Sequence, residues 1–211
     1  MRTGVGNVVL AATAALIASA GAAAPAAATV KTWTVRPGGK ITAMAGKTTL
    51  ADTPTGATIP CESSRMSGTL KAGSGLPGAG IGSLTTTVYS LCSAGPFGAT
   101  VTAHGLPWRL NLTSYDRRTG VARGTISHLQ ISTAPSFIQC TAVVKGTSGT
   151  APDGVMPVSY TSKTGVLKVL PTGGNLHWYH VHNCAGIIRN GDAATLTVSY
   201  AISPRQVIAS P

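Results

Sequence analysis

In the segment TLTVSYAIS, residues Thr195–Ser203, large apolar side chains alternate with Thr, Ser and the small Ala201. Its even-numbered positions, from Leu196 to Ile202, are all apolar. They share one face of an extended chain, because successive side chains of a strand point to opposite faces. The β-branched and aromatic residues also suit a pleated, half-buried surface. The segment therefore predicts a strand with one face against an apolar core.

The same alternation recurs along the chain, interrupted by Gly, Pro and Asn, and no stretch after residue 28 keeps a 3.6-residue apolar period. The other predicted strands are Val30–Arg36, Ser83–Leu91, Trp108–Tyr115, Val121–Ser132, Phe137–Val144 and Val166–Leu170. The glycine-rich run Gly73–Gly82 reads as a long loop. Closely spaced strands without helices between them predict an all-β, antiparallel fold, either a sandwich or barrel-like.

Residues 1–28 have the pattern of a secretory signal peptide. Arg2 precedes the uncharged, Ala-rich stretch Val8–Ala24, and Ala26-Ala27-Ala28 places a cut before Thr29. A cut before Gly21 is the alternative site, and an uncleaved membrane anchor is the alternative function. The pattern predicts a secreted, extracellular protein whose single β-rich domain spans residues 29–211, with no transmembrane segment after the signal is removed.

Four cysteines, Cys61, Cys92, Cys140 and Cys184, lie in the predicted mature chain. An even number in an exported protein predicts two disulfides, for which three connectivities exist. Cys61 and Cys140 each lead into a Gly-Thr segment, whereas Cys92 and Cys184 are each followed by a glycine-containing turn and an Ala-Thr segment. This internal similarity favours the pairs Cys61–Cys92 and Cys140–Cys184 and suggests two related halves.

The segment NLHWYHVHNC, Asn175–Cys184, gathers three of the five histidines. On a regular strand, His180 and His182 share a face with Trp178 and Cys184. An H-x-H pair can begin a zinc or copper site, because both imidazoles converge from positions i and i+2. A third ligand has to come from elsewhere in the chain, for instance His104 or His128.

Two other interpretations of this strand stay open. In one, His177, His180 and His182 only form hydrogen bonds or face solvent, and no cofactor is needed. In the other, Trp178 and Tyr179 offer flat faces for stacking on a carbohydrate.

The chain carries a formal charge of +11, with 16 basic and five acidic side chains. Loss of Arg2 with the signal leaves +10. The basic residues are scattered, and Arg117-Arg118 with Arg123 form the single local cluster. This charge favours acidic partners. Export and the lack of a nucleic-acid-binding motif argue against nucleic acid, so the expected partner is an anionic cell-wall polymer or an anionic polysaccharide.

Enzyme signatures are weak. No G-x-S-x-G element, phosphate loop or dinucleotide fingerprint occurs, and Asp153 and Asp192 lie in turn sequences. The favoured function is therefore a non-enzymatic binding or structural protein of the cell envelope or the medium. The alternative is a secreted hydrolase or metal-dependent enzyme that uses the His180/His182 strand.

Three further segments carry a resemblance: GTLKAGSGL (Gly68–Leu76), GLPWRLNLTSYD (Gly105–Asp116) and VLKVLPTGGNLHWY (Val166–Tyr179). Together with the Ala-rich leader and the paired cysteines, they resemble a group of exported β-rich proteins of high-GC Gram-positive bacteria of the streptomycete type. The resemblance covers most of residues 29–211. It implies export and a β-rich fold, and it carries no activity and no site residues.

Overall fold

The computed structural model describes residues 1, 4, 31–136 and 139–211, and all sixteen regular elements within them are β-strands. The predicted all-β, antiparallel class is confirmed. Apart from residues 1 and 4, the predicted signal at residues 1–28 lies outside the described part, as do the first two residues of the predicted strand Phe137–Val144. The described residues contain no helix long and apolar enough to cross a membrane.

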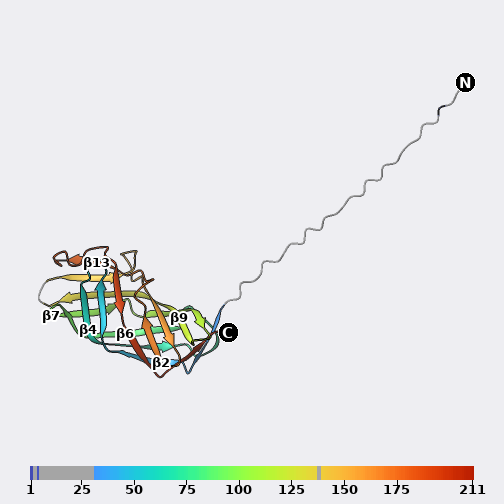
Figure 1. Ribbon diagram of the computed structural model, residues 1–211, viewed down its shortest axis with the longest axis horizontal. Helices are drawn as coiled ribbons and strands as arrows, with labels where there is room; N and C mark the ends of the chain where they lie inside the picture. Colours follow the sequence, from blue (N-terminus) through green and yellow to red (C-terminus); the bar gives the residue numbers. More distant parts are fainter. Residues whose placement is uncertain (2–3, 5–30, 137–138) are drawn as a thin grey trace.

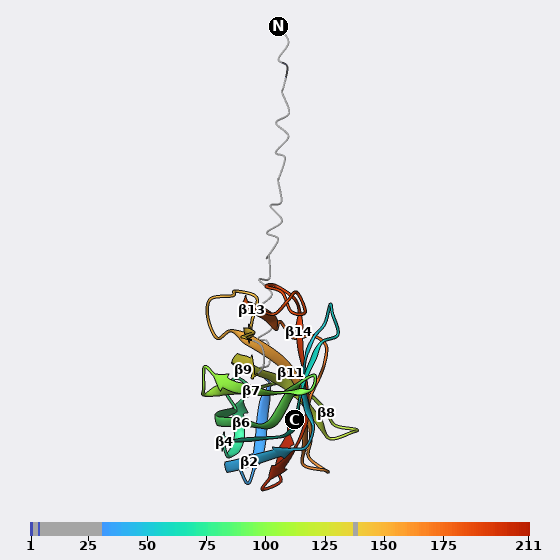
Figure 2. The same ribbon diagram turned by 90° about the vertical axis from the view of Figure 1, so that its left-hand side faces the viewer.

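Eight strands close an antiparallel barrel (Figures 1 and 2). In order around the barrel they are β2 (Gly39–Ala45), β15 (Ser199–Ser203), β12 (Val166–Val169), β11 (Gly154–Thr161), β9 (Val121–Pro135), β8 (Trp108–Asp116), β6 (Gly82–Ala94) and β4 (Thr58–Leu70). Closure leaves none of these strands with an unpaired edge.

A second ring of strands continues from one end of the barrel. The long strands β4, β6 and β9 run through both rings, and five strands belong to the second ring alone: β3 (Thr48–Asp52), β7 (Phe97–His104), β10 (Thr141–Lys145), β13 (His177–His182) and β14 (Ala194–Thr197). Backbone hydrogen bonds from Trp178 to Asp192 and from Ala194 to Leu176, both 2.8 Å, join β13 to the β14 side. In both views β13 lies at one end of the body and β2 toward the other (Figures 1 and 2).

The shared strands change their inward face where the two rings meet. On β9, the even-numbered residues from Ala122 to Ile126 are buried, but beyond His128 the odd-numbered residues from Leu129 to Thr133 are buried. His128 has a positive φ of 68°, and the pairing with β11 shifts register at this point. A one-residue bulge inverts the side-chain alternation, so a single strand can line two successive interiors.

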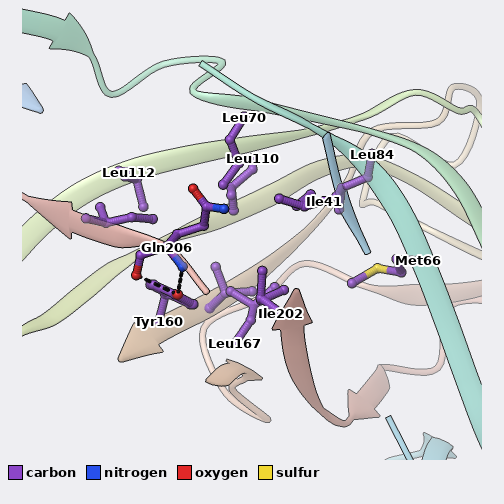
Figure 3. Close-up of a pocket in the computed structure, with 12 residues that line it drawn as sticks. Ile41, Met66, Leu70, Leu84, Leu110, Leu112, Tyr160, Leu167, Ile202 and Gln206 are labelled. Atoms are coloured by element: carbon purple, nitrogen blue, oxygen red, sulfur yellow. Dashed lines mark hydrogen bonds between the residues drawn. The ribbon is translucent and has the colours of Figure 1, made fainter. Parts of the chain in front are cut away.

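The barrel interior is filled by side chains (Figure 3). Twelve residues, mostly Leu, Ile and Met, surround a remaining space of about 20 Å³, which is room for roughly one water molecule. Gln206 is fully buried there. Its Oε1 accepts from the Gly38 N–H at 2.8 Å, its Nε2 donates to the Pro204 carbonyl at 2.8 Å, and its backbone bonds to the Tyr160 hydroxyl on both sides. Every polar group of this glutamine is therefore satisfied.

A small sheet covers this end of the barrel. It contains β16 (Val207–Ala209), β1 (Thr32–Arg36) and β5 (Gly73–Pro77) in that order. Trp33, Val35 and Ile208 are buried between the sheet and the barrel strands. The expectation of a loop over Gly73–Gly82 is wrong for its first half, because backbone pairing with β1 extends the glycine-rich chain.

Both predicted disulfides are present, Cys61–Cys92 and Cys140–Cys184. Cys61 and Cys92 face each other across β4 and β6, and the second bridge joins the residue before β10 to a residue just after β13. Both bridges therefore lie in the second ring. Each ring draws strands from both halves of the sequence, so the suggested pair of related halves does not correspond to the two rings.

Candidate functional site

Strand β13, the predicted HWYHVH site, divides its side chains between the interior and the solvent. Trp178 is buried, whereas His180 and His182 are exposed. The prediction that Trp178 and Cys184 share a face with the two histidines is wrong. His180 has a positive φ of 49°, and the pairing with β10 shifts register between Thr141 and Val143. This irregularity breaks the two-residue alternation on which the prediction rested.

The histidines of β13 have protein partners. Lys145 Nζ donates to His180 Nε2 at 3.0 Å and lies 5.7 Å from the centre of the Tyr179 ring. His177 Nδ1 donates to the Asn175 carbonyl at 3.0 Å. Across the described ranges no group of three His, Cys, Asp or Glu side chains is placed to hold a metal ion. His180 and His182 therefore gain no third ligand from this part of the chain.

The surfaces expected for carbohydrate stacking are also engaged in the fold. Trp178 is only 1% exposed. The Tyr179 hydroxyl donates to the Thr147 carbonyl at 3.2 Å, and its ring packs beside Gly149. A flat sugar-binding platform requires exposed ring faces, and Trp178 does not provide one on the outer surface.

The second ring instead encloses a cavity of about 630 Å³. Its wall is built from the residues 56–59 that lead into β4, the β6–β7 turn at 94–97, Thr133 and Pro135 at the end of β9, Trp178, and the loop at 184–188. Cys140 and Cys184 both line it. The cavity has the volume of a small-molecule site, typically about 300–1,000 Å³.

Hydrogen bonds fix the two loops at the cavity mouth. Thr55 Oγ1, in the loop after β3, shares its one proton between the Asp52 carboxylate at 2.6 Å and the Ile187 carbonyl at 2.9 Å, which links this loop to the loop at 184–188. Asp192 Oδ2 accepts from the Arg189 N–H at 2.9 Å within the second loop. These contacts hold the mouth in one arrangement without a ligand.

Unusual backbone conformations concentrate in the same region. Asn183 and Ala185 have φ values of 54° and 50°. For alanine this left-handed conformation costs about 1 kcal/mol. Ala185 lines the cavity, next to the bridge at Cys184. Strain of this kind is found preferentially at binding sites.

A separate feature lies at the opposite end of β9. The β8–β9 turn carries Arg117 and Arg118, and the β11–β12 turn carries Lys163; the two turns meet where the Ser162 N–H donates to the Gly120 carbonyl at 3.4 Å. Arg205 donates to the Lys163 carbonyl at 3.1 Å. We call Arg117, Arg118, Arg123, Lys163 and Arg205 the cationic cluster, and all five are exposed.

Asp116 is the only carboxylate on these two turns, and it is already engaged. Its Oδ1 accepts from the backbone N–H groups of Arg118 at 2.9 Å and Thr119 at 3.3 Å. Hydrogen bonding to the Thr119 side chain and backbone lowers the pKa of Asp116, which keeps it charged within the turn. The arginines and the lysine therefore present their charge to solvent.

The cationic cluster was only partly visible in the sequence. Arg117, Arg118 and Arg123 are neighbours along the chain, but Lys163 and Arg205 join them only through strand pairing. No pattern in the sequence indicated the cavity, since six separate segments form its wall. Comparison of this chain with protein-family models, with curated proteins and with solved structures finds no match.

Proposed function

We propose that this protein is a secreted, non-enzymatic binding protein that attaches to an anionic polymer of the cell envelope through its cationic cluster. The observation that carries the proposal is the meeting of five exposed basic side chains on or beside two adjoining turns, with their one carboxylate neighbour bonded to the backbone. Multiple like charges on one surface attract a polyanion over a distance of about 8–10 Å at moderate salt.

Two further observations support this proposal. Of the 15 basic residues in the described chain, only Lys145 is buried, so the whole body presents a positive field. Both disulfides are formed, which suits the oxidising compartment that the signal-like residues 1–28 predict. An extended anionic polymer matches dispersed charge better than a small anion does, because it can contact several basic groups at once.

The test is sedimentation of the purified mature protein with isolated bacterial cell walls, before and after chemical extraction of their anionic polymers. We expect binding at about 0.02 M salt, weakening as the salt concentration rises because exposed charges are screened. The variant with Arg117→Gln, Arg118→Gln, Lys163→Gln and Arg205→Gln should bind at least about tenfold more weakly, since each basic residue near an anionic surface contributes up to about 1 kcal/mol.

The matched control removes four exposed basic residues elsewhere: Lys40→Gln, Lys47→Gln, Arg65→Gln and Arg189→Gln. Both variants have the same net charge. Equal loss of binding in the two variants would show that general charge, and not the cluster, is responsible. Unchanged binding to walls stripped of anionic polymer would contradict the choice of partner.

A further inference from the structure

We infer that the cavity of the second ring is a binding site for a small, neutral, largely apolar molecule. This site lies at the opposite end of β9 from the cationic cluster and is independent of it.

The wall selects against charge. Of the sixteen described residues that line the cavity, none has an ionisable side chain, and the only side-chain hydroxyls among them are those of Thr58 and Thr133. A carboxylate or ammonium group moved into such a space loses its hydration without gaining a counter-ion, which is strongly unfavourable. The basic residues that dominate the rest of the surface are absent from the lining, so an anionic ligand is excluded on the same ground.

Large apolar side chains are exposed at the mouth. Ile187 is 51% exposed and Phe97 is 37% exposed, and both line the cavity. Exposed apolar groups that gather around a concavity mark a contact surface for an apolar ligand. A molecule that enters the cavity covers these groups as well as its own surface, and both changes favour binding through the hydrophobic effect.

Two polar atoms in the wall residues have no hydrogen-bond partner among the described residues, Thr133 Oγ1 and Trp178 Nε1. Both atoms are buried from solvent, so the class of ligand follows from the apolar side chains that line the cavity. The Trp178 ring nevertheless lies in the wall, where its fluorescence can report on an occupant.

The site is preformed. The Cys140–Cys184 bridge joins two parts of the wall, and the Thr55–Ile187 hydrogen bond joins the two loops at the mouth. A rigid, open cavity binds with little loss of conformational entropy, because the loops do not have to be ordered by the ligand. The left-handed Ala185 beside the bridge shows that the loop conformation is imposed by its surroundings.

The experiment compares two probes that differ by one charged group. N-Phenyl-1-naphthylamine is neutral, and 8-anilino-1-naphthalenesulfonate has the same rings with a sulfonate. The full mature protein is titrated with each at 0.5 M salt, where surface attraction is screened, and the fluorescence of the probe and of the protein's three tryptophans, Trp178 among them, is followed. We expect one molecule of the neutral probe per protein and at least about tenfold weaker binding of the sulfonate.

Two substitutions fill the cavity, Ala94→Trp and Ala57→Phe, and Ala201→Trp adds the same bulk on the exposed outer wall of the barrel. Each cavity variant should lose the neutral probe at least tenfold, whereas the control should keep it, with circular dichroism confirming the fold of all three. Equal or tighter binding of the sulfonate would overturn the inference. Probe binding that survives in a folded cavity variant would also overturn the inference. So would binding that occurs only at protein concentrations at which the chain forms a dimer.

Discussion

The two interiors of this protein share the three long strands β4, β6 and β9 but are filled very differently. The barrel leaves about 20 Å³ unfilled and satisfies its buried Gln206 completely. The second ring leaves about 630 Å³ and is crosslinked by both disulfides. A well-packed interior is stabilised by contacts between its side chains. An interior with a large cavity lacks many of these contacts and needs another source of stability. The crosslinks are placed where packing is missing.

The largest expected effect comes from removing the bridge at the cavity wall. Replacing Cys140 and Cys184 by serine opens a loop of 44 residues, which costs roughly 4 kcal/mol in the chain-entropy model. We expect native-state hydrogen exchange to show faster exchange in the 184–192 loop than in the barrel strands, because stability is lost locally first. A uniform loss of protection in both rings would show that the bridge stabilises the barrel as much as the cavity end.

Truncation of one apolar side chain in each interior measures how tightly the barrel and the second ring are packed. Leu84 lines the barrel interior and Ile188 lines the cavity, and both are buried. Leu84→Ala creates a new void in a filled core and should cost about 2–5 kcal/mol. Ile188→Ala only enlarges an existing space and should cost about half as much or less. Urea unfolding of the two variants measures both values, and equal losses would mean that the cavity end is packed as tightly as the barrel.

A pH effect is expected where the two rings meet. Burial raises the pKa of Tyr200 to about 12, and burial together with the nearby Tyr200 raises that of Tyr89. The unfolded chain ionises its tyrosines near pH 10. The contribution from these neutral phenols is therefore complete below about pH 10 and is lost as the pH rises through the folded value, by roughly 3 kcal/mol for Tyr200.

Thermal unfolding between pH 9 and 12, compared with Tyr200→Phe, measures this loss. The phenylalanine variant lacks the hydroxyl that accepts from Ser64 at 3.0 Å, so it should be less stable at pH 8 but less sensitive to alkali. Identical alkaline sensitivity of the two proteins would place the responsible group elsewhere.

The sequence predicts most of what the alternation of side chains controls. Leu196, Val198, Tyr200 and Ile202 are all buried, as the pattern of Thr195–Ser203 indicates, and both cysteine pairs are confirmed. The fold class could be predicted because it depends on the alternation of neighbouring residues. The disulfide pairing could be predicted because four cysteines allow only three connectivities.

The remaining features depend on single backbone angles and on long-range pairing. The inward face of β9 changes at His128, and the side-chain alternation of β13 breaks at His180. Each change arises from one residue with positive φ, and a histidine in the sequence does not indicate that conformation. The glycines of Gly73–Pro77 look like a loop until β1 pairs with them. The cavity and the full cationic cluster exist only after distant strands have been brought together.

The measurement that tests the central claim most directly is an NMR titration of the ¹⁵N-labelled mature protein with N-phenyl-1-naphthylamine at 0.5 M salt. If the probe binds in the cavity, amide shift changes are confined to residues 56–59, 94–97 and 184–188, and the barrel lining at Leu110 and Leu167 is unaffected. Shift changes centred on the barrel lining, or saturable changes at Arg117 and Arg118 with none at the cavity, would contradict this claim.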